Sequence, residues 1–280
     1  MSTLLIDGVA VPRLWYGTAW KEDATEGLVA QALAAGFRAI DTANQRKHYH
    51  EAGVGAAVRT ALAGGLARDA LILQSKFTFA SGQDHRLPYD PAAPIATQVA
   101  QSFARSLEHL GVDRLDSLVL HGPSQARGLG PDDHAAWRAM EAIHARGQVR
   151  WLGISNTSAA QLDAMVAFAE VRPTFVQNRC YAERGWDREV RARCRAHGIT
   201  YQGFSLLTAN RQVVADRRVV AIAQRHAVAP AQVVLRHALD LGMIALTGTR
   251  DPVHMRDDLA IATLVLTDDD RAALAAVAPA

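Results

Sequence analysis

The stretch LDSLVLHGP, residues 115–123, joins a short apolar run to a histidine and a glycine-proline pair. Such a run is typical of a buried strand with polar residues where the strand ends. A helical pattern precedes it over residues 94–110, where apolar side chains recur at spacings of three and four and Gly111 follows as a helix stop. A helix followed by a buried strand is the repeating unit of a parallel sheet.

The same alternation continues along nearly the whole chain, with Thr157 or Ser158 as the N-cap of one further helix. Eight strands are predicted, at residues 14–17, 37–41, 71–76, 115–121, 149–155, 174–178, 199–204 and 243–247. Eight strand-helix units fit 280 residues, because a (β/α)8 TIM barrel needs roughly 250. We therefore predict one TIM-barrel domain over residues 1–280. A doubly wound open sheet is the alternative, but residues 15–21 lack the GxGxxG turn of a dinucleotide-binding sheet.

The composition disfavours several kinds of partner. The 30 basic and 28 acidic residues are spread along the chain and give a net charge of +2, so neither a nucleic acid nor a membrane surface is expected. Two cysteines, Cys180 and Cys194, are too few for a disulfide scaffold and lack zinc-ligand spacing. The low cysteine content indicates a reducing cytoplasm. Without a signal-peptide pattern or an apolar run of about 18 residues, we expect a soluble protein, and a monomer is favoured.

Polar residues end most of the predicted strands. They are Asp41, Lys76, His121, Ser155 with Asn156, and Gln177 with Asn178. In a TIM barrel the C-terminal ends of the strands surround the active site, so these side chains are expected to converge.

Four of these strand regions together resemble the aldo-keto reductase family. The matching segments are GFRAIDTA (36–43), LILQSKF (71–77), LDSLVLHGP (115–123) and LGISN (152–156), in the family's order and at similar intervals. The resemblance implies an NAD(P)H-dependent oxidoreductase that reduces aldehydes or ketones to alcohols by hydride transfer, with a tyrosine as general acid.

The family's catalytic set of Asp, Lys and His corresponds to Asp41, Lys76 and His121. Its tyrosine usually comes five positions after the Asp, where this chain has Arg46, so the resemblance points to Tyr49 in a slightly enlarged loop. Carbonyl reduction needs a proton donor, and an ammonium near a phenol is expected to lower its pKa from about 10. Alternatively Tyr49 is a loop aromatic and His48 or His50 lies nearer the substrate.

The resemblance also implies an extended dinucleotide across the barrel mouth. Ser155 and Asn156 match the pair that holds the nicotinamide carboxamide, together with either Gln177 or Asn178. Phe204 would stack under the nicotinamide, with Ser205 and Leu207 approaching the pyrophosphate. The remaining expected cofactor contacts are Gly17, Thr18, Asp41, Gly248, Thr249, Arg250, His254 and Asp258.

Gly248 replaces the family's usual lysine, and Arg250 is expected to supply the cation for a 2′-phosphate. NADPH is therefore preferred and NADH is the alternative. Trp20, Phe77 and His121 are expected to contact the substrate, in a permissive pocket for small aldehydes or ketones.

Two other functions remain open. The barrel could bind NADPH as a sensor without turnover, or it could be a metallohydrolase that uses His48, His50, Glu51 and His121.

Overall fold

A closed barrel of parallel strands forms the centre of the molecule. The computed structural model describes residues 2–277. Going round the barrel, the strand order is β10-β3-β4-β5-β6-β7-β8-β9, so neighbours in the chain are neighbours in the wall. The strands are β3 (Leu14–Gly17), β4 (Ala39–Asp41), β5 (Ile72–Phe77), β6 (Leu115–Leu120), β7 (Val149–Ser155), β8 (Phe175–Arg179), β9 (Thr200–Phe204) and β10 (Ile244–Thr247). The TIM-barrel prediction is confirmed, and each predicted strand boundary lies within two residues of the observed one.

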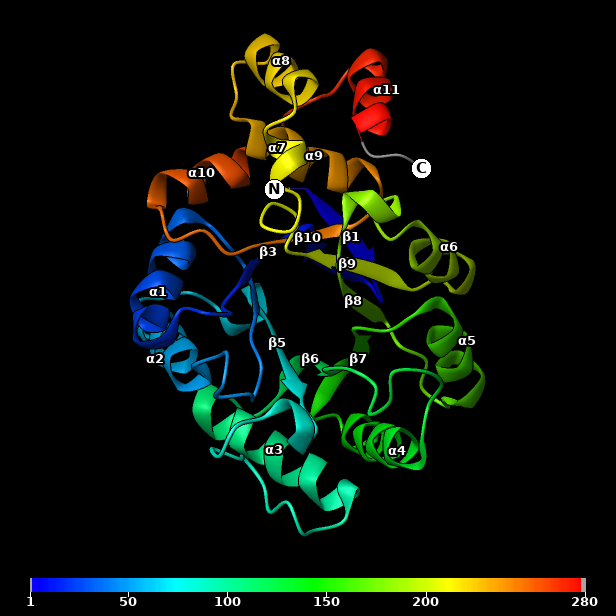
Figure 1. The fold of residues 1–280 in the computed structure, drawn as a ribbon. Helices are drawn as coiled ribbons and strands as arrows, with labels where there is room; N and C mark the ends of the chain where they lie inside the picture. The colour runs from blue at the N-terminus through cyan, green and yellow to red at the C-terminus, as the bar shows by residue number, and fades with distance from the viewer. Residues whose placement is uncertain (1, 278–280) are drawn as a thin grey trace.

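Helices surround the barrel on its outside (Figure 1). They are α1 (Thr25–Ala35), α2 (Glu51–Ala63), α3 (Ile95–Leu110), α4 (Pro131–Ala145), α5 (Ala159–Phe168), α6 (Arg188–His197), α7 (Arg211–Val214), α8 (Arg217–Arg225), α9 (Pro230–Asp240), α10 (Pro252–Ala260) and α11 (Asp268–Val277). The short 3-10 turns are η1 (Glu22–Ala24), η2 (Arg68–Ala70), η3 (Ala80–Gly82) and η4 (Ala182–Arg184). Among residues 2–277, no helix is long and apolar enough to span a bilayer.

The helix ends follow from local sequence. Ser158 caps α5 because its hydroxyl accepts from the Gln161 amide, while the Gln161 side chain accepts from the Ser158 backbone. Gly111 ends α3 in the left-handed region at φ 68°, which a residue without a Cβ adopts at little cost. Both features match the sequence-based expectation.

An antiparallel hairpin, which the sequence reasoning missed, precedes the barrel. Strands β1 (Thr3–Ile6) and β2 (Val9–Pro12) are joined by Asp7 and Gly8, both at positive φ, as a two-residue hairpin turn requires. Its apolar side chains pack on a core cluster that includes Trp15, Trp151 and Phe175. The hairpin therefore covers the N-terminal end of the barrel and leaves the other end for the site.

A polar layer crosses the barrel interior. Gln74 and Gln202 donate to each other's carbonyl oxygens at 3.0 and 3.3 Å, and Gln177 donates to Gln202 at 2.9 Å. The Ser117 hydroxyl donates to Gln74 at 2.8 Å. The Gln74 and Gln202 amides thus pair with each other in a buried position, where an unpaired polar group would be costly. The layer forms the floor of the cavity above it.

Candidate active site

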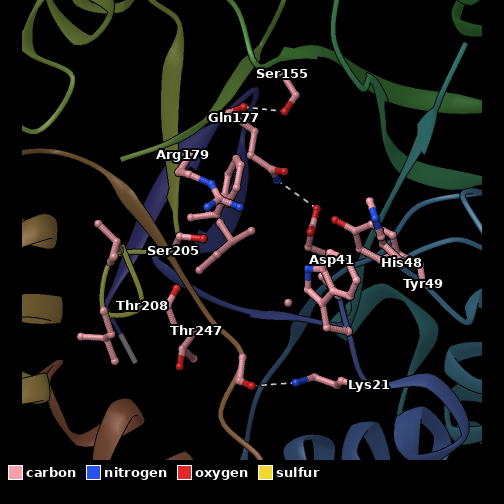
Figure 2. A pocket seen from close by; sticks show the side chains of 18 of the residues that line it. Lys21, Asp41, His48, Tyr49, Ser155, Gln177, Arg179, Ser205, Thr208 and Thr247 are labelled. Carbon is pink, nitrogen blue, oxygen red and sulfur yellow. Dashed lines mark hydrogen bonds between the residues drawn. The ribbon is translucent and has the colours of Figure 1, made fainter. Parts of the chain in front are cut away.

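A cavity of about 840 Å³ opens at the C-terminal ends of the strands. Its lining comes from loops after most of the barrel strands. Figure 2 shows Ser155 and Gln177 at one end of the view and Lys21 at the other, so the cavity is elongated. A cavity of this size and shape can hold an extended ligand beside a smaller one.

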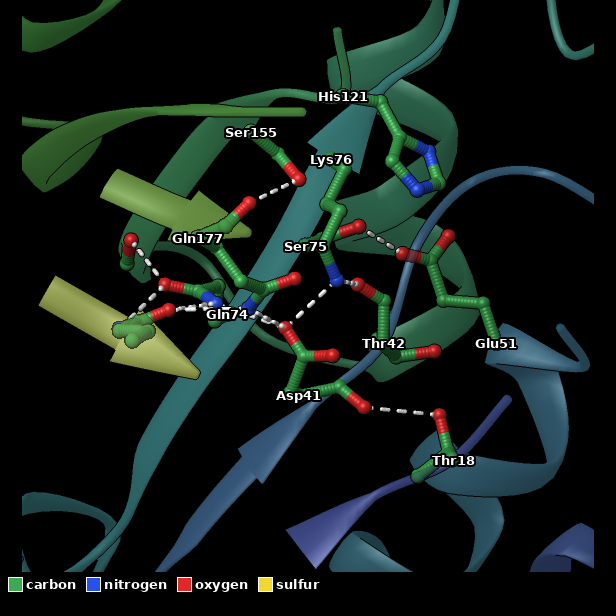
Figure 3. Close-up of polar contacts among 12 residues, drawn as sticks. Thr18, Asp41, Thr42, Glu51, Gln74, Ser75, Lys76, His121, Ser155 and Gln177 are labelled. Carbon is green, nitrogen blue, oxygen red and sulfur yellow. Dashed lines mark hydrogen bonds and ion pairs between the residues drawn. The ribbon is translucent and has the colours of Figure 1, made fainter. Parts of the chain in front are cut away.

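An ion pair between Asp41 and Lys76 lies at the bottom of this cavity (Figure 3). The Lys76 ammonium donates to Asp41 Oδ1 at 2.6 Å and to the Thr42 carbonyl at 2.8 Å. The same carboxylate oxygen accepts from the Gln74 and Gln177 amides at 2.7 and 2.9 Å. Burial lowers the pKa of Lys76, and the Asp41 charge opposes that shift. The glutamine layer thus fixes the carboxylate that holds the lysine.

The Tyr49 ring reaches this pair because one tight turn precedes it. The backbone amides of His48 and Tyr49 both donate to the Gln45 carbonyl, at 3.0 and 2.9 Å. The Lys76 ammonium lies 5.2 Å from the Tyr49 ring centre, and the His121 ring centre lies 5.9 Å from it. Within residues 2–277 the Tyr49 hydroxyl has no hydrogen-bond partner, and it faces the cavity.

The protonation of Tyr49 differs from the sequence-based expectation. Burial, together with the Asp41 charge, raises the pKa of Tyr49, whereas the nearby lysine was expected to lower it. The reason is that Asp41 neutralises the Lys76 ammonium, so the desolvation of the phenol dominates. The phenol is therefore protonated at neutral pH and is available as a proton donor.

His121 follows β6 and lines the cavity beside Tyr49. Its Nδ1 lies 2.6 Å from the Thr78 hydroxyl. Burial, and then the charges of Lys76 and His48, hold the pKa of His121 well below its usual value. The imidazole is therefore neutral.

Two side-chain oxygens remain free for a ligand at the Ser155 end of the cavity. The Asn156 amide nitrogen donates to the His121 carbonyl at 2.7 Å, and Gln177 donates to Asp41 and Gln202. Neither side-chain oxygen accepts a hydrogen bond from the part of the chain that is described, and both residues line the cavity. Two acceptors here fit a ligand amide, which has two N–H donors.

Aromatic and small residues continue the lining at the end of β9. Phe204, Ser205 and Leu207 all face the cavity, and Ser205 has a φ of 56°. The Arg179 guanidinium lies 5.6 Å from the centre of the Phe204 ring.

The far end of the cavity carries two neighbouring cations. The Lys21 ammonium donates to the Gly248 carbonyl at 2.7 Å (Figure 2), and Arg250 donates to the Trp20 and Lys21 carbonyls at 3.3 Å. Burial and the Arg250 charge lower the pKa of Lys21 to about 8. Neither cation pairs with a carboxylate among residues 2–277. A bound anion would therefore stabilise both.

The family model for the aldo/keto reductase family matches residues 11–279. The chain belongs to the aldo-keto reductase family. Similar proteins include the glyoxal reductase of Bacillus subtilis, 30% identical over 248 residues (86% of this chain and 80% of that protein). The methylglyoxal reductase DkgA of Yersinia pestis is 28% identical over 275 residues (96% and 90%). A solved aldo/keto reductase from Brucella melitensis has a TM-score of 0.83 at 26% identity, covering 99% of each chain. This chain is thus an oxidoreductase that reduces carbonyl groups.

Most of the aldo-keto reductase site expected from sequence gathers around this cavity. Asp41, Tyr49 and His121 line it, and Lys76 lies directly beneath. The expected cofactor residues on the cavity surface are Gly17, Ser155, Asn156, Gln177, Phe204, Ser205, Leu207, Gly248, Thr249, Arg250, His254 and Asp258, and Trp20 lies there on the substrate side. Asp258 is bonded to the Thr247 hydroxyl at 2.6 Å, and burial raises its pKa to about 6.

Besides Lys76, three expected residues lie outside the cavity lining. The Asn178 side chain bonds Thr157 and Asp187 on the outer side of the wall, which leaves Gln177 to face inward. Phe77 is buried against Phe79 and Tyr89, and Phe79 lines the cavity instead. The Thr18 hydroxyl donates to the Asp41 carbonyl at 2.9 Å, so Thr18 supports the site from behind.

Other cavity residues were not anticipated. Lys21 supplies a cation beside Gly248, where the family's usual lysine is missing. In the sequence it directly follows Trp20, which was expected to contact the substrate. Arg179, Phe79 and Gln45 were also missed.

The four metallohydrolase candidates do not form a cluster. Glu51 turns away from the cavity to bond Ser75 and His109, and His50 contacts the Glu22 carbonyl. Among residues 2–277, no three His, Cys, Asp or Glu side chains gather as metal ligands would.

Proposed function

We propose that this aldo-keto reductase reduces aldehydes or ketones to alcohols with NADPH, and that Tyr49 is the proton donor. One observation carries the proposal: the Tyr49 hydroxyl faces the cavity, has no hydrogen-bond partner within residues 2–277, and is kept protonated by burial. A general acid must hold its proton at the working pH and must reach the oxygen that receives it.

The surrounding side chains suit this role. When bound, the dinucleotide supplies a hydride to the carbonyl carbon. Tyr49 gives its proton to the carbonyl oxygen, and the Lys76 ammonium, 5.2 Å from the ring centre, stabilises the phenolate that forms. Neutral His121 orients the same oxygen: the Thr78 hydroxyl can donate to Nδ1, which leaves the proton on Nε2.

The cavity fits a nicotinamide dinucleotide at both ends. The free oxygens of Asn156 and Gln177 would accept from the carboxamide, and the Phe204 ring offers a stacking face. Lys21 and Arg250 would hold phosphate oxygens. NADPH is favoured because these two cations have no carboxylate partner in residues 2–277. Nearby Asp257 and Asp258 are the features that favour NADH as the alternative.

Small carbonyl compounds suit the remaining space. Trp20 and Phe79 give this cavity apolar walls, and two relatives are named for the reduction of glyoxal and methylglyoxal. We therefore include short aldehydes and dicarbonyls among the substrates.

The test compares Tyr49→Phe with the wild type. NADPH affinity, followed by protein fluorescence, should stay within about twofold, while kcat for methylglyoxal should fall by about 100-fold or more. Tyr89→Phe is the matched control, because Tyr89 is a buried phenol bonded to the Thr78 carbonyl and lies outside the cavity lining. Unchanged turnover in Tyr49→Phe would refute the role of Tyr49. A wild-type protein that binds NADPH but reduces no aldehyde in a panel would instead be a sensor.

A further inference from the structure

A chain of side-chain contacts beside Tyr49 has no part in the proposed reaction. His48 lines the cavity, and its ring centre lies 4.0 Å from that of Trp20. Its Nδ1 lies 2.9 Å from Gln45 Oε1, and the Gln45 amide nitrogen lies 2.6 Å from the Gly82 carbonyl oxygen. Trp20 and Gln45 therefore hold the His48 imidazole in place, and the Gly82 carbonyl holds Gln45.

This chain determines which nitrogen of His48 carries the proton. A backbone carbonyl only accepts hydrogen bonds, so Gln45 must present its NH2 group to Gly82 and its oxygen to His48. That oxygen also only accepts, so His48 must carry its proton on Nδ1. In the neutral ring, Nε2 then has a lone pair and no proton.

The Nε2 atom is free to meet a ligand. Within the described residues it has no hydrogen-bond partner, and it is accessible. Burial and the neighbouring Lys47 charge lower the pKa of His48, with Asp84 opposing them, which favours the neutral ring. Because Tyr49 is the next residue, this acceptor lies near the group that would protonate a carbonyl.

We propose that His48 is a substrate-specificity residue whose Nε2 accepts a hydrogen bond from a substrate hydroxyl group. The cavity would then prefer hydroxyaldehydes or hydroxyketones to unsubstituted carbonyls of the same length. This inference rests on the proposed reductase function. Gln45 is a positioning residue, because it acts only by fixing the His48 tautomer.

The experiment uses D-glyceraldehyde and propanal, which have the same number of carbons but differ in their hydroxyl groups. His48→Phe keeps a ring against Trp20 and removes the acceptor. We expect the ratio of kcat/KM for glyceraldehyde to that for propanal to fall by about 10-fold in His48→Phe, the effect of roughly one hydrogen bond to the substrate. Both substrates are measured on the same variant, so a partial loss of folded protein cancels in the ratio.

Two further variants sharpen the result. Gln45→Met leaves His48 in place but frees its tautomer, and should lower the ratio by about threefold. His50→Phe makes the same exchange outside the cavity lining and should leave the ratio unchanged. Equal losses for both substrates in His48→Phe would overturn the proposal. If the wild type reduces neither compound nor any other carbonyl tested, the proposed function itself fails.

Discussion

The Lys76 ammonium lies 2.6 Å from the Asp41 carboxylate, and neither side chain is more than 4% exposed. Removal of one partner from a buried pair leaves an uncompensated charge, which costs about 3–5 kcal/mol. Lys76→Met should therefore lower the free energy of unfolding by about that amount, as measured by urea denaturation. Carbonyl reduction should fall by about 100-fold or more, because the phenolate loses its cation.

A double variant separates charge from packing. Asp41→Asn combined with Lys76→Met removes both charges, and should be more stable than Lys76→Met alone by about 1–3 kcal/mol. If the double variant loses as much unfolding free energy as Asp41→Asn and Lys76→Met lose in sum, the two charges are independent.

The binding of NADPH should weaken above pH 8. Lys21 has a pKa of about 8, so it is charged below that pH and neutral above it. A phosphate prefers the charged form, so Kd should rise with pH by up to about 10-fold per unit until the pKa of the complex is passed. Isothermal titration between pH 6.5 and 9.5 measures this rise in Kd, which we call the Kd step.

Two variants identify the titrating group. Lys21→Met should bind more weakly at pH 7 and lose the step. Arg250→Met should keep the step but move it to higher pH, because the Arg250 charge is one cause of the lowered pKa. A step that survives in Lys21→Met would assign it to another residue.

Phe204 should contribute to cofactor affinity through its ring face. Phe204→Ala should raise Kd for NADPH by about 5- to 10-fold, since stacking is worth about 1 kcal/mol beyond simple burial. Phe204→Tyr keeps the ring and should bind within about twofold of the wild type. Equal affinity of the alanine variant would place the nicotinamide elsewhere.

Gly55 should be essential to the packing of α2 on α3. A Cβ added at Gly55 would overlap the His109 carbonyl oxygen of α3, a backbone atom that cannot rotate away. Gly55→Ala should cost about 1–3 kcal/mol in thermal or urea unfolding. Gly27→Ala is the matched control, because Gly27 lies inside α1 with open space around it. This variant should be more stable than the wild type by about 0.5–1 kcal/mol. Equal effects at both positions would contradict the close-packing argument.

The barrel strands could be predicted because they are buried on both faces and read as continuous apolar runs. The hairpin of β1 and β2 was missed since its strands have four residues each and are only partly buried. Its Asp7-Gly8 pair was the available signal.

Errors in the site come mostly from the alternation of side chains along a strand. Since Lys76 faces inward, Phe77 must face outward. The same alternation makes Gln177 face inward and Asn178 face outward. The place of the Lys21 ammonium in the cavity could not be predicted, because it depends on the Gly248 carbonyl, more than 200 residues away in the sequence. The raised pKa of Tyr49 was missed because it depends on burial and on how Asp41 neutralises Lys76.

The glutamine layer beneath Asp41 limits how this protein can diversify. Gln202 bonds both Gln74 and Gln177, and these two donate to Asp41, so a change at any one removes hydrogen bonds from its buried neighbours. Residues on the cavity loops, such as Trp20 and Phe79, carry no such mutual dependence. Descendants with new substrates, whether natural or from directed evolution, should therefore inherit the floor unchanged and accumulate their differences in the rim.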